Sequence, residues 1–301
     1  MHPTIPPTNY SIEMTTMEEL EEKYKEIVRE RDYLLEQMKS FLLQEIIYGQ
    51  FSSEDEIIAK AGLLHFDLTK PYYLCLIGFS FNAYDFKNEL SFCREVISSL
   101  SHYFTKVNET YLINQNDHHI QLFITDQFLH NEEKFLFFKE LKKFLHSRFP
   151  GSSFDLGVSN KKTSILHAPT SFKEAKASKR MITSKKHIVF FESLGIVGTL
   201  INGNNENDVR NMAKNLLGNL EINSYKNLDL IKTLYSFLIN GGNLEKTAEE
   251  LSLSISGLRY RVNKIEELLA KDIRCPIISS QLIIAIQGLI LLGDLNMKDS
   301  K

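Results

Sequence analysis

The sequence predicts a multidomain α+β protein, with an N-terminal coiled-coil helix, a central α/β sheet domain and an all-α C-terminal domain that contains a helix-turn-helix. Residues 17–45 repeat apolar side chains at alternating spacings of three and four. Residues 72–191 alternate between apolar, strand-like runs and amphipathic helices. Residues 243–269 contain two helical patterns separated by a three-residue turn. A length of 301 residues with 43% hydrophobic content is sufficient for about two folded cores.

Composition narrows the cellular setting and the kinds of partner. The formal net charge of −3 excludes a protein that binds nucleic acid through an overall basic surface. Any DNA affinity must therefore come from local basic patches. Cys75, Cys93 and Cys275 form no C-x-x-C pair and are expected to be buried thiols in a reducing cytoplasm. The N-terminus lacks the pattern of a signal peptide, and the apolar run at residues 277–292 is broken by polar residues. We therefore expect a cytoplasmic protein without membrane contact.

The N-terminal region is expected to mediate self-association. Residues 1–15 are polar, contain prolines and are expected to be disordered. Residues 16–48 are expected to form a coiled-coil dimerisation helix with two apolar heptad positions. One position holds Leu20, Ile27, Leu34 and Phe41, and the other holds Met17, Tyr24, Arg31, Met38 and Glu45. The alternative is a helix packed on its own domain. Because the segment precedes the globular part, we favour a homodimer.

The α/β sheet domain is expected at residues 49–200. Two short helices, at 42–49 and from Ser52-Ser53 to Gly62, should precede its first strand. Strands are predicted at 72–79 (buried on both faces), 110–113, 120–125, 154–158 and 187–191, with a hairpin turn at 114–117. Helices are predicted at 89–103, 132–148 and 171–182. This order implies a central sheet with helices packed over it.

A linker and connecting helix are expected at residues 201–225, followed by the helix-turn-helix domain at 226–295. Within it, Gly241-Gly242 ends a helix and Asn243 can cap the next one. Leu253 points inward from the turn, and Ser254 caps the second helix. A final helix is predicted to begin at Cys275-Pro276.

The second helix of this pair has one dry side and one basic side. Its apolar stripe consists of Leu258, Val262, Ile265 and Leu269. A helix of this kind suits the DNA major groove, although a helical hairpin with solvated charges would show the same pattern. The predicted DNA-binding residues are Ser254, Ile255, Ser256, Arg259, Tyr260, Arg261, Asn263 and Lys264. Arg259 is the best candidate for a guanine contact, and Arg261 and Lys264 are expected at phosphates.

A second basic stretch lies between residues 160 and 187. It contains Lys161, Lys162, Lys173, Lys176, Lys179, Arg180, Lys185 and Lys186, against the single acidic residue Glu174. A solvated face explains the pattern without any function. The functional alternatives are an anion pocket, or contacts of Lys173, Lys176 and Arg180 with DNA phosphates.

The C-terminal region resembles the DNA-binding domain of the PucR/CdaR family of bacterial transcriptional regulators. The residues that carry the resemblance are 234–238 (LYSFL), Gly241-Gly242-Asn243, Thr247-Ala248, 258–261 (LRYR), 265–269 (IEELL) and 282–292. Ser254, Ser256 and Gly257 stand where the family usually carries His, Asn and Thr. Serine cannot make the bidentate contact of asparagine to adenine. The resemblance therefore implies the docking mode but not the operator sequence.

Residues 156–159 (LGVS), 172–177 (FKEAKA) and 191–195 (FESLG) resemble the degenerate GGDEF-like domain that precedes the DNA-binding domain in this family. An active diguanylate cyclase needs a glycine-rich hairpin with acidic residues for its nucleotide and divalent metal. The hairpin here, residues 114–119 (NQNDHH), has no glycine and one carboxylate. His118 and His119 are adjacent in a strand and point to opposite faces, so we expect surface residues and no metal site.

Together, these observations predict a sequence-specific DNA-binding regulator that acts as a homodimer on double-stranded DNA. The family resemblance implies an activator of a metabolic operon and leaves open a small-molecule effector of unknown identity. We expect no cofactor and no catalytic activity, because the sequence contains no nucleophile-base motif, no P-loop and no G-x-S-x-G. Two other functions remain open. The central domain could be a residual nucleotide-binding or cyclase-type enzyme, or the chain could be an interaction scaffold that no longer binds DNA.

Overall fold

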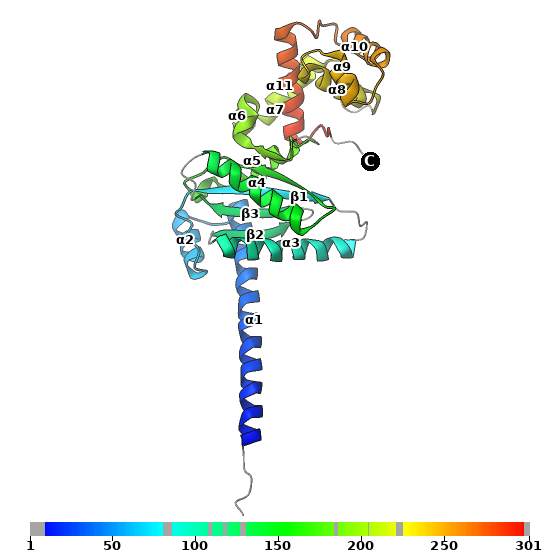
Figure 1. Ribbon diagram of the computed structural model, residues 1–301. Helices are drawn as coiled ribbons and strands as arrows, with labels where there is room; N and C mark the ends of the chain where they lie inside the picture. The colour runs from blue at the N-terminus through cyan, green and yellow to red at the C-terminus, as the bar shows by residue number, and fades with distance from the viewer. Residues whose placement is uncertain are drawn as a thin grey trace, which may run out of the picture.

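The computed structural model of the chain describes residues 10–80, 86–107, 110–116, 119–126, 131–183, 186–203, 205–220 and 225–297. A long helix projects from one end of a sheet domain, and a helical domain lies at the other end (Figure 1). The architecture is multidomain α+β, as the sequence predicts.

The projecting helix, α1, spans Tyr10–Tyr48. It begins earlier than expected and ends at the predicted residue, because no proline or glycine interrupts the chain over these 39 residues. Residues 10–15, expected to be disordered, belong to α1, whereas residues 1–9 lie outside the described part of the chain. The short helix expected at residues 42–49 is the C-terminal end of α1, so this prediction was wrong.

The central sheet has the strand order β2-β3-β1-β4-β5. The strands are β1 (Tyr72–Ser80), β2 (Tyr111–Asn116), β3 (His119–Thr125), β4 (Ser153–Val158) and β5 (Ile188–Phe190). β1 is antiparallel to β3 and β4, and β5 is parallel to β4. Because β1 lies in the middle, residues 72–78 are all buried, which explains its continuous apolar sequence.

The turn between β2 and β3 is shorter than the sequence predicts. Asn114, Gln115 and Asn116 pair with Gln121, Ile120 and His119, so they belong to the strand and not to the turn. The connection reduces to residues 117 and 118, which lie outside the described residues. The asparagines were assigned to a turn because they are typical turn residues, but cross-strand pairing decides their conformation here.

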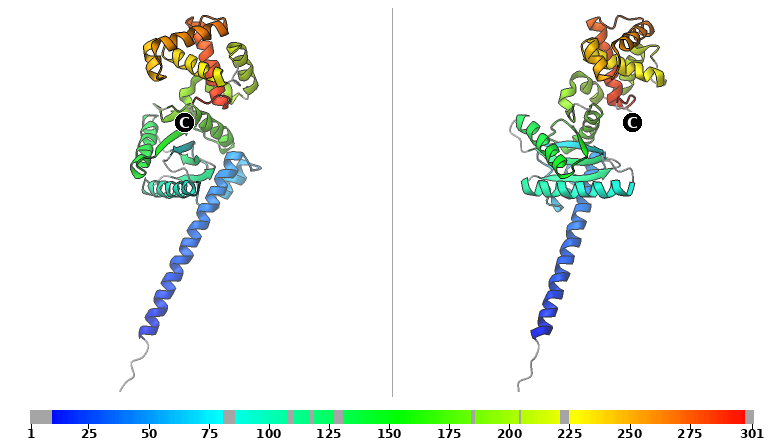
Figure 2. Two further views of the ribbon diagram at one scale, coloured as in Figure 1. Left: turned by 90° about the vertical axis from the view of Figure 1, so that its right-hand side faces the viewer. Right: turned by 45° about the vertical axis from the view of Figure 1, so that its right-hand side comes forward.

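Helices cover both faces of the sheet (Figure 2). Tyr73, Cys75 and Ile77 of β1 contribute to a core with residues of α3 (Phe86–Val107) and α4 (Asn131–Arg148). Tyr72 and Leu74 contribute to the core on the opposite face. That core includes the end of α1 and α2 (Glu54–Leu63), which Ser53 caps by accepting a hydrogen bond from Glu56 N–H at 3.2 Å.

The helix α5 (Ala168–Arg180) packs very closely on the sheet. A Cβ atom at Gly157 of β4 would lie 2.4 Å from the carbonyl oxygen of Ala175, so only glycine fits at this crossing. The short helix α6 (Gly195–Asn202) then leads away from the sheet domain towards the C-terminal helices.

The C-terminal domain contains α7 (Glu206–Leu217), α8 (Tyr225–Ile239), α9 (Leu244–Glu250), α10 (Ile255–Leu269) and α11 (Pro276–Leu292). Its core combines residues from all of them. Ala213 and Leu217 of α7 are buried in this core, although the sequence suggested a connecting helix ahead of the domain. Long apolar α11 is its central element, and no helix among the described residues is long and apolar enough to cross a membrane.

The cysteines differ in their environment. Cys75 and Cys93 are buried, as expected, whereas Cys275 is half-buried at the start of α11. Burial raises the pKa of the Cys75 thiol far above its ordinary value, so this side chain stays a neutral thiol within the core.

Candidate nucleic-acid interface

Two capped helices form the helix-turn-helix. Gly241 and Gly242, with φ of 64° and 78°, end α8 in the left-handed conformation that the sequence predicts. Asn243 then caps α9, because its Oδ1 atom accepts a hydrogen bond from Lys246 N–H at 2.9 Å. Both predictions are confirmed.

The turn between the helices is set by backbone contacts and one inward side chain. Ser252 has a φ of 53°, an uncommon value for a residue other than glycine. The N–H of Leu253 donates to the carbonyl of Ala248 at 2.9 Å, and the Leu253 side chain packs against the domain core. Ser254 caps α10 by accepting from Gly257 N–H at 3.1 Å.

Helix α10 has the two-sided character expected from its sequence. Its apolar stripe, Leu258, Val262, Ile265 and Leu269, is buried in the core of the C-terminal domain. On the outer side, Tyr260 is 68% exposed. The predicted DNA-binding residues that the structure leaves exposed are Ser254, Ile255, Ser256, Arg259, Tyr260, Asn263 and Lys264. The helix lies at the end of the domain farthest from the sheet (Figures 1 and 2).

Arg261 lies in a different position from the other predicted DNA-binding residues. Its side chain is half-buried, and Nη1 donates a hydrogen bond to Thr233 Oγ1 at 3.2 Å. Thr233 Oγ1 in turn donates to the carbonyl of Asp229, all within α8. Arg261 therefore makes a structural contact that holds α10 against α8, and its phosphate contact stays a prediction.

Ser254 also has a structural use. Its hydroxyl accepts the capping hydrogen bond from Gly257 N–H and lies 3.2 Å from the hydroxyl of Ser256. Because the Ser254 hydroxyl caps the helix, it is less available for the predicted DNA contact. Arg259, Tyr260 and Asn263 lie on the exposed face of α10.

Sequence reasoning missed the polar contacts that fix α9 against α8. Ser236 Oγ donates to Glu250 Oε1 at 3.0 Å, and Asn240 Nδ2 donates to Glu250 Oε2 at 3.3 Å. The sequence contained a signal, since Ser236 interrupts an otherwise apolar stretch of α8. Its partner Glu250 follows only from the fold.

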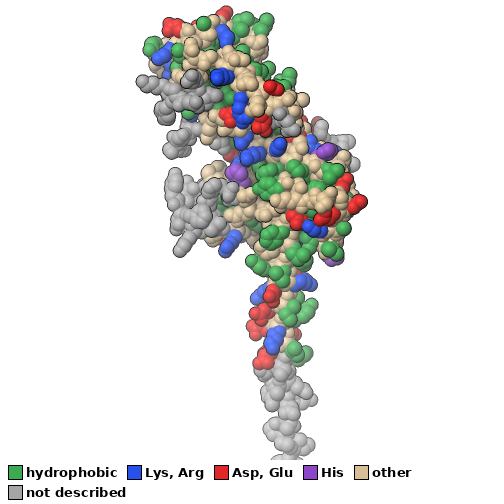
Figure 3. Space-filling view, turned by 180° about the vertical axis from the view of Figure 1, so that it is seen from behind, with side chains coloured by type: hydrophobic (Ala, Val, Ile, Leu, Met, Phe, Trp, Pro, Cys, Tyr) green, Lys and Arg blue, Asp and Glu red, His purple; other side chains and the backbone are tan. Residues whose placement is uncertain are grey.

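The heptad residues of α1 form an exposed stripe. Leu20, Ile27, Leu34 and Phe41 are between 54% and 64% exposed along the part of α1 that projects from the sheet domain (Figure 1). In the space-filling view, hydrophobic side chains lie along this projecting helix together with charged ones (Figure 3). The alternative of packing on the protein's own domain applies only to the last turns, where Leu42 and Leu43 are buried. Glu45 pairs with Lys60 at 3.0 Å in this part.

The second basic stretch does not form a single face. Lys173 and Lys176 are exposed on α5, whereas Lys185 lies outside the described residues. Arg180 donates through Nη1 to the backbone carbonyl of Leu291 in α11, and burial lowers the pKa of its guanidinium. Arg180 therefore takes part in the contact between the two domains, and its phosphate contact stays a prediction.

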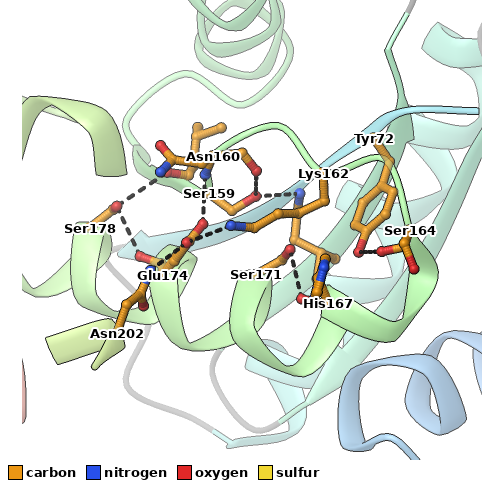
Figure 4. A network of polar contacts seen from close by, with 12 residues as sticks. Tyr72, Ser159, Asn160, Lys162, Ser164, His167, Ser171, Glu174, Ser178 and Asn202 are labelled. Atoms are coloured by element: carbon orange, nitrogen blue, oxygen red, sulfur yellow. Dashed lines mark hydrogen bonds and ion pairs between the residues drawn. The ribbon is translucent and has the colours of Figure 1, made fainter. Parts of the chain in front are cut away.

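Glu174, the one acidic residue in this stretch, is the centre of a buried polar network (Figure 4). Its carboxylate accepts hydrogen bonds from Lys162 Nζ at 2.8 Å, Asn202 Nδ2 at 2.6 Å and Asn160 N–H at 2.8 Å. These donors come from the loop after β4 and from the end of α6. Lys162 is therefore an internal ion-pair partner and not part of a solvated basic surface.

The β2–β3 hairpin has a structural role. Asn114 is buried; its Oδ1 accepts from Ser40 Oγ of α1 at 2.6 Å, and its Nδ2 donates to Gln121 Oε1 at 2.8 Å. His118 lies outside the described residues, and His119 lies beside Lys179, with 2.6 Å between Nδ1 and Nζ. Among the described residues, no three His, Cys, Asp or Glu side chains are placed to hold a metal ion.

Comparison with known proteins identifies both globular domains. A family model described as a GGDEF-like domain matches residues 48–181, and one described as the PucR C-terminal helix-turn-helix domain matches residues 230–287. No curated protein matches the chain significantly. One similar solved structure is the Regulator of Polyketide Synthase Expression from Bifidobacterium adolescentis. It is 13% identical, with a TM-score of 0.42, and the match covers 83% of this chain and 92% of that chain.

Proposed function

Because the chain belongs to the PucR/CdaR family of DNA-binding transcriptional regulators, with a GGDEF-like domain ahead of a PucR-type helix-turn-helix, we propose that it binds its operator as a homodimer. In this proposal α10 enters the major groove and α1 joins two copies of the chain. The central domain connects α1 to the helix-turn-helix domain. The family resemblance favours activation of a metabolic operon.

The observation that carries the proposal is the exposed face of α10. Arg259, Tyr260, Asn263 and Lys264 are exposed on the side opposite the buried stripe. Arginine and asparagine supply the bidentate donors and acceptors that distinguish base pairs in the major groove. Lysine supplies a phosphate contact at the edge of the groove. The face therefore combines groups for sequence readout with groups for affinity.

The dimer follows from the small footprint of one helix. A single recognition helix contacts only a few base pairs, so a specific site needs two copies. A second copy of this chain suits the exposed stripe of α1, because its apolar residues recur with the 3-4 spacing of a two-stranded coiled coil. A two-fold dimer would place the two α10 helices on half-sites separated by about 34 Å or a multiple of that distance.

For the central domain we propose a non-catalytic role. The hairpin that would cradle a triphosphate in a cyclase instead carries Asn114 and Asn116, which hold α1 through Ser40 and Tyr48. Incubation with GTP and Mg²⁺ would test this proposal, since formation of a cyclic nucleotide would restore the enzyme alternative.

The DNA-binding proposal can be tested by selecting the genomic DNA fragments that the full chain binds. Footprinting then shows which bases of these fragments the chain protects. We expect two protected half-sites with two-fold symmetry, one or more helical turns apart, and affinity that decreases with salt. A reporter gene behind the selected site tests for activation. Absence of salt-dependent binding to any duplex would contradict the proposal and favour the interaction scaffold.

A further inference from the structure

Ile255 is an exposed apolar residue at the first position of α10. It is 43% exposed and directly follows the capping residue Ser254. Unlike Leu253 and Leu268, it does not pack against the core of the C-terminal domain in the described part of the chain. A large part of this apolar residue is therefore accessible to a ligand.

The residues around Ile255 favour recognition of an apolar group on DNA by the first turn of α10. The hydroxyls on either side of it, from Ser254 and Ser256, lie 3.2 Å from each other, and Ser254 also caps the helix at Gly257. Gly257 adds no side chain to this turn. Ile255 is thus the largest exposed side chain in the first turn of α10.

Ile255 precedes Arg259, the best candidate for a guanine contact, by four residues on the same helix. Residues four apart lie on the same face of a helix, with about 5–6 Å between their Cβ atoms. Both side chains are exposed. Two such residues reach base edges that are one or two base pairs apart, since successive base pairs are about 3.4 Å apart along the duplex.

We propose that Ile255 recognises the C5-methyl group of a thymine that lies one or two base pairs from the guanine bound by Arg259. The inference rests on the proposed insertion of α10 into the major groove. Thymine is the only base that presents a methyl group there, and apolar side chains recognise it by direct contact. The operator half-site therefore contains a thymine whose methyl group contributes to affinity.

Replacing thymine by deoxyuridine in the selected operator tests this inference without changing the protein. The substitution removes one methyl group and keeps every hydrogen-bonding group of the base. For the wild-type chain we expect about a fourfold loss of affinity for each half-site at one thymine position, and no loss at the other thymines. Ile255→Ala should show the same loss on the thymine operator and no further loss on the deoxyuridine operator.

Ile196→Ala is the control, because Ile196 is an exposed isoleucine on α6, outside the helix-turn-helix. This variant should bind the thymine operator like wild type and retain the full deoxyuridine penalty. The inference would be overturned if wild type bound both operators equally, or if Ile255→Ala still lost affinity when thymine is replaced by deoxyuridine. Either result would leave the proposed DNA binding intact as long as the footprint is observed. If no duplex is protected, the proposed function fails first, and the inference fails with it.

Discussion

Arg180 at the end of α5 donates a hydrogen bond to the backbone carbonyl of Leu291 in the last turn of α11. The guanidinium also packs against Gly293, which follows that helix. A cation at a helix C-terminus interacts favourably with the unpaired carbonyls of the last turn. This contact joins the GGDEF-like domain to the terminal helix of the DNA-binding domain, across 111 positions in the sequence.

Arg180→Gln should therefore lower the stability of the protein. We expect a loss of about 1–2 kcal/mol in the free energy of unfolding, because a partly buried hydrogen bond from a charged group is removed. Urea unfolding measures it, and Lys176→Gln on the same helix is the control that should stay close to wild type. An unchanged stability with a reduced salt dependence of DNA binding would instead support the phosphate contact predicted from the sequence.

Of the three residues predicted to contact phosphates between residues 160 and 187, Lys173 and Lys176 are exposed on α5. If both contact phosphates, Lys173→Gln combined with Lys176→Gln should weaken DNA binding without changing sequence preference. The slope of log affinity against log salt should decrease in magnitude by about two, since each contact releases roughly one counterion. A slope equal to that of wild type would leave these lysines as a solvated face.

If the heptad stripe of α1 joins two copies of the chain, Ile27→Asp should convert the proposed dimer to a monomer. Ile27 and Tyr33 are both 64% exposed on α1, but only Ile27 belongs to the heptad stripe. An aspartate at Ile27 would bury an unpaired charge between two helices, whereas one at Tyr33 would remain in solvent. Light scattering should show a monomer for Ile27→Asp and a dimer for Tyr33→Asp. A dimer that survives Ile27→Asp would move the interface away from the heptad stripe.

Arg259→Ala should cost about 1–3 kcal/mol of operator binding and relax the preference at one symmetric pair of base positions. Footprinting and affinity measurements on single-base operator variants would detect both effects. Arg94→Ala is a suitable control, because Arg94 is an exposed arginine on α3 in the other domain. If Arg259→Ala kept the affinity and base preference of wild type, α10 would not be the recognition helix.

Glu174→Ala should be strongly destabilising. Glu174 has no exposed surface, and its removal would leave the Lys162 ammonium and the Asn160 and Asn202 donors without their acceptor. Loss of one partner of a buried ion pair costs about 3–5 kcal/mol. Glu174→Gln should cost less, since its amide oxygen can still accept. Thermal or urea unfolding separates the two variants, and equal stability of Glu174→Ala and wild type would mean that the network contributes little.

Much of the fold could be predicted because its signals are local. The strand at residues 72–79, the cap at Asn243 and the buried stripe of α10 depend on side chains within a few positions of each other. The structure confirms all three. The failures were local ambiguities: Asn114 and Asn116 have turn propensity, but pairing with β3 outweighs it.

The candidate site was predictable only in part. Periodicity placed Arg259, Tyr260 and Asn263 on the exposed face of α10. It could not show that Arg261 is held by Thr233, because that contact depends on the packing of α8 against α10. For the same reason, Glu250 and Ser236 did not emerge as a pair from the sequence.

By itself, the sequence determined most of the segments that form helices and strands, which side of α10 is dry, and that α1 carries an apolar heptad stripe. Only the tertiary structure decided that this stripe stays uncovered by the protein's own domain as far as Phe41, that Glu174 neutralises Lys162, and that Arg180 binds α11. Secondary structure and periodicity arise from neighbours in sequence. The partner of a buried charge is selected by the folded chain, which brings together residues that have no fixed spacing in the sequence.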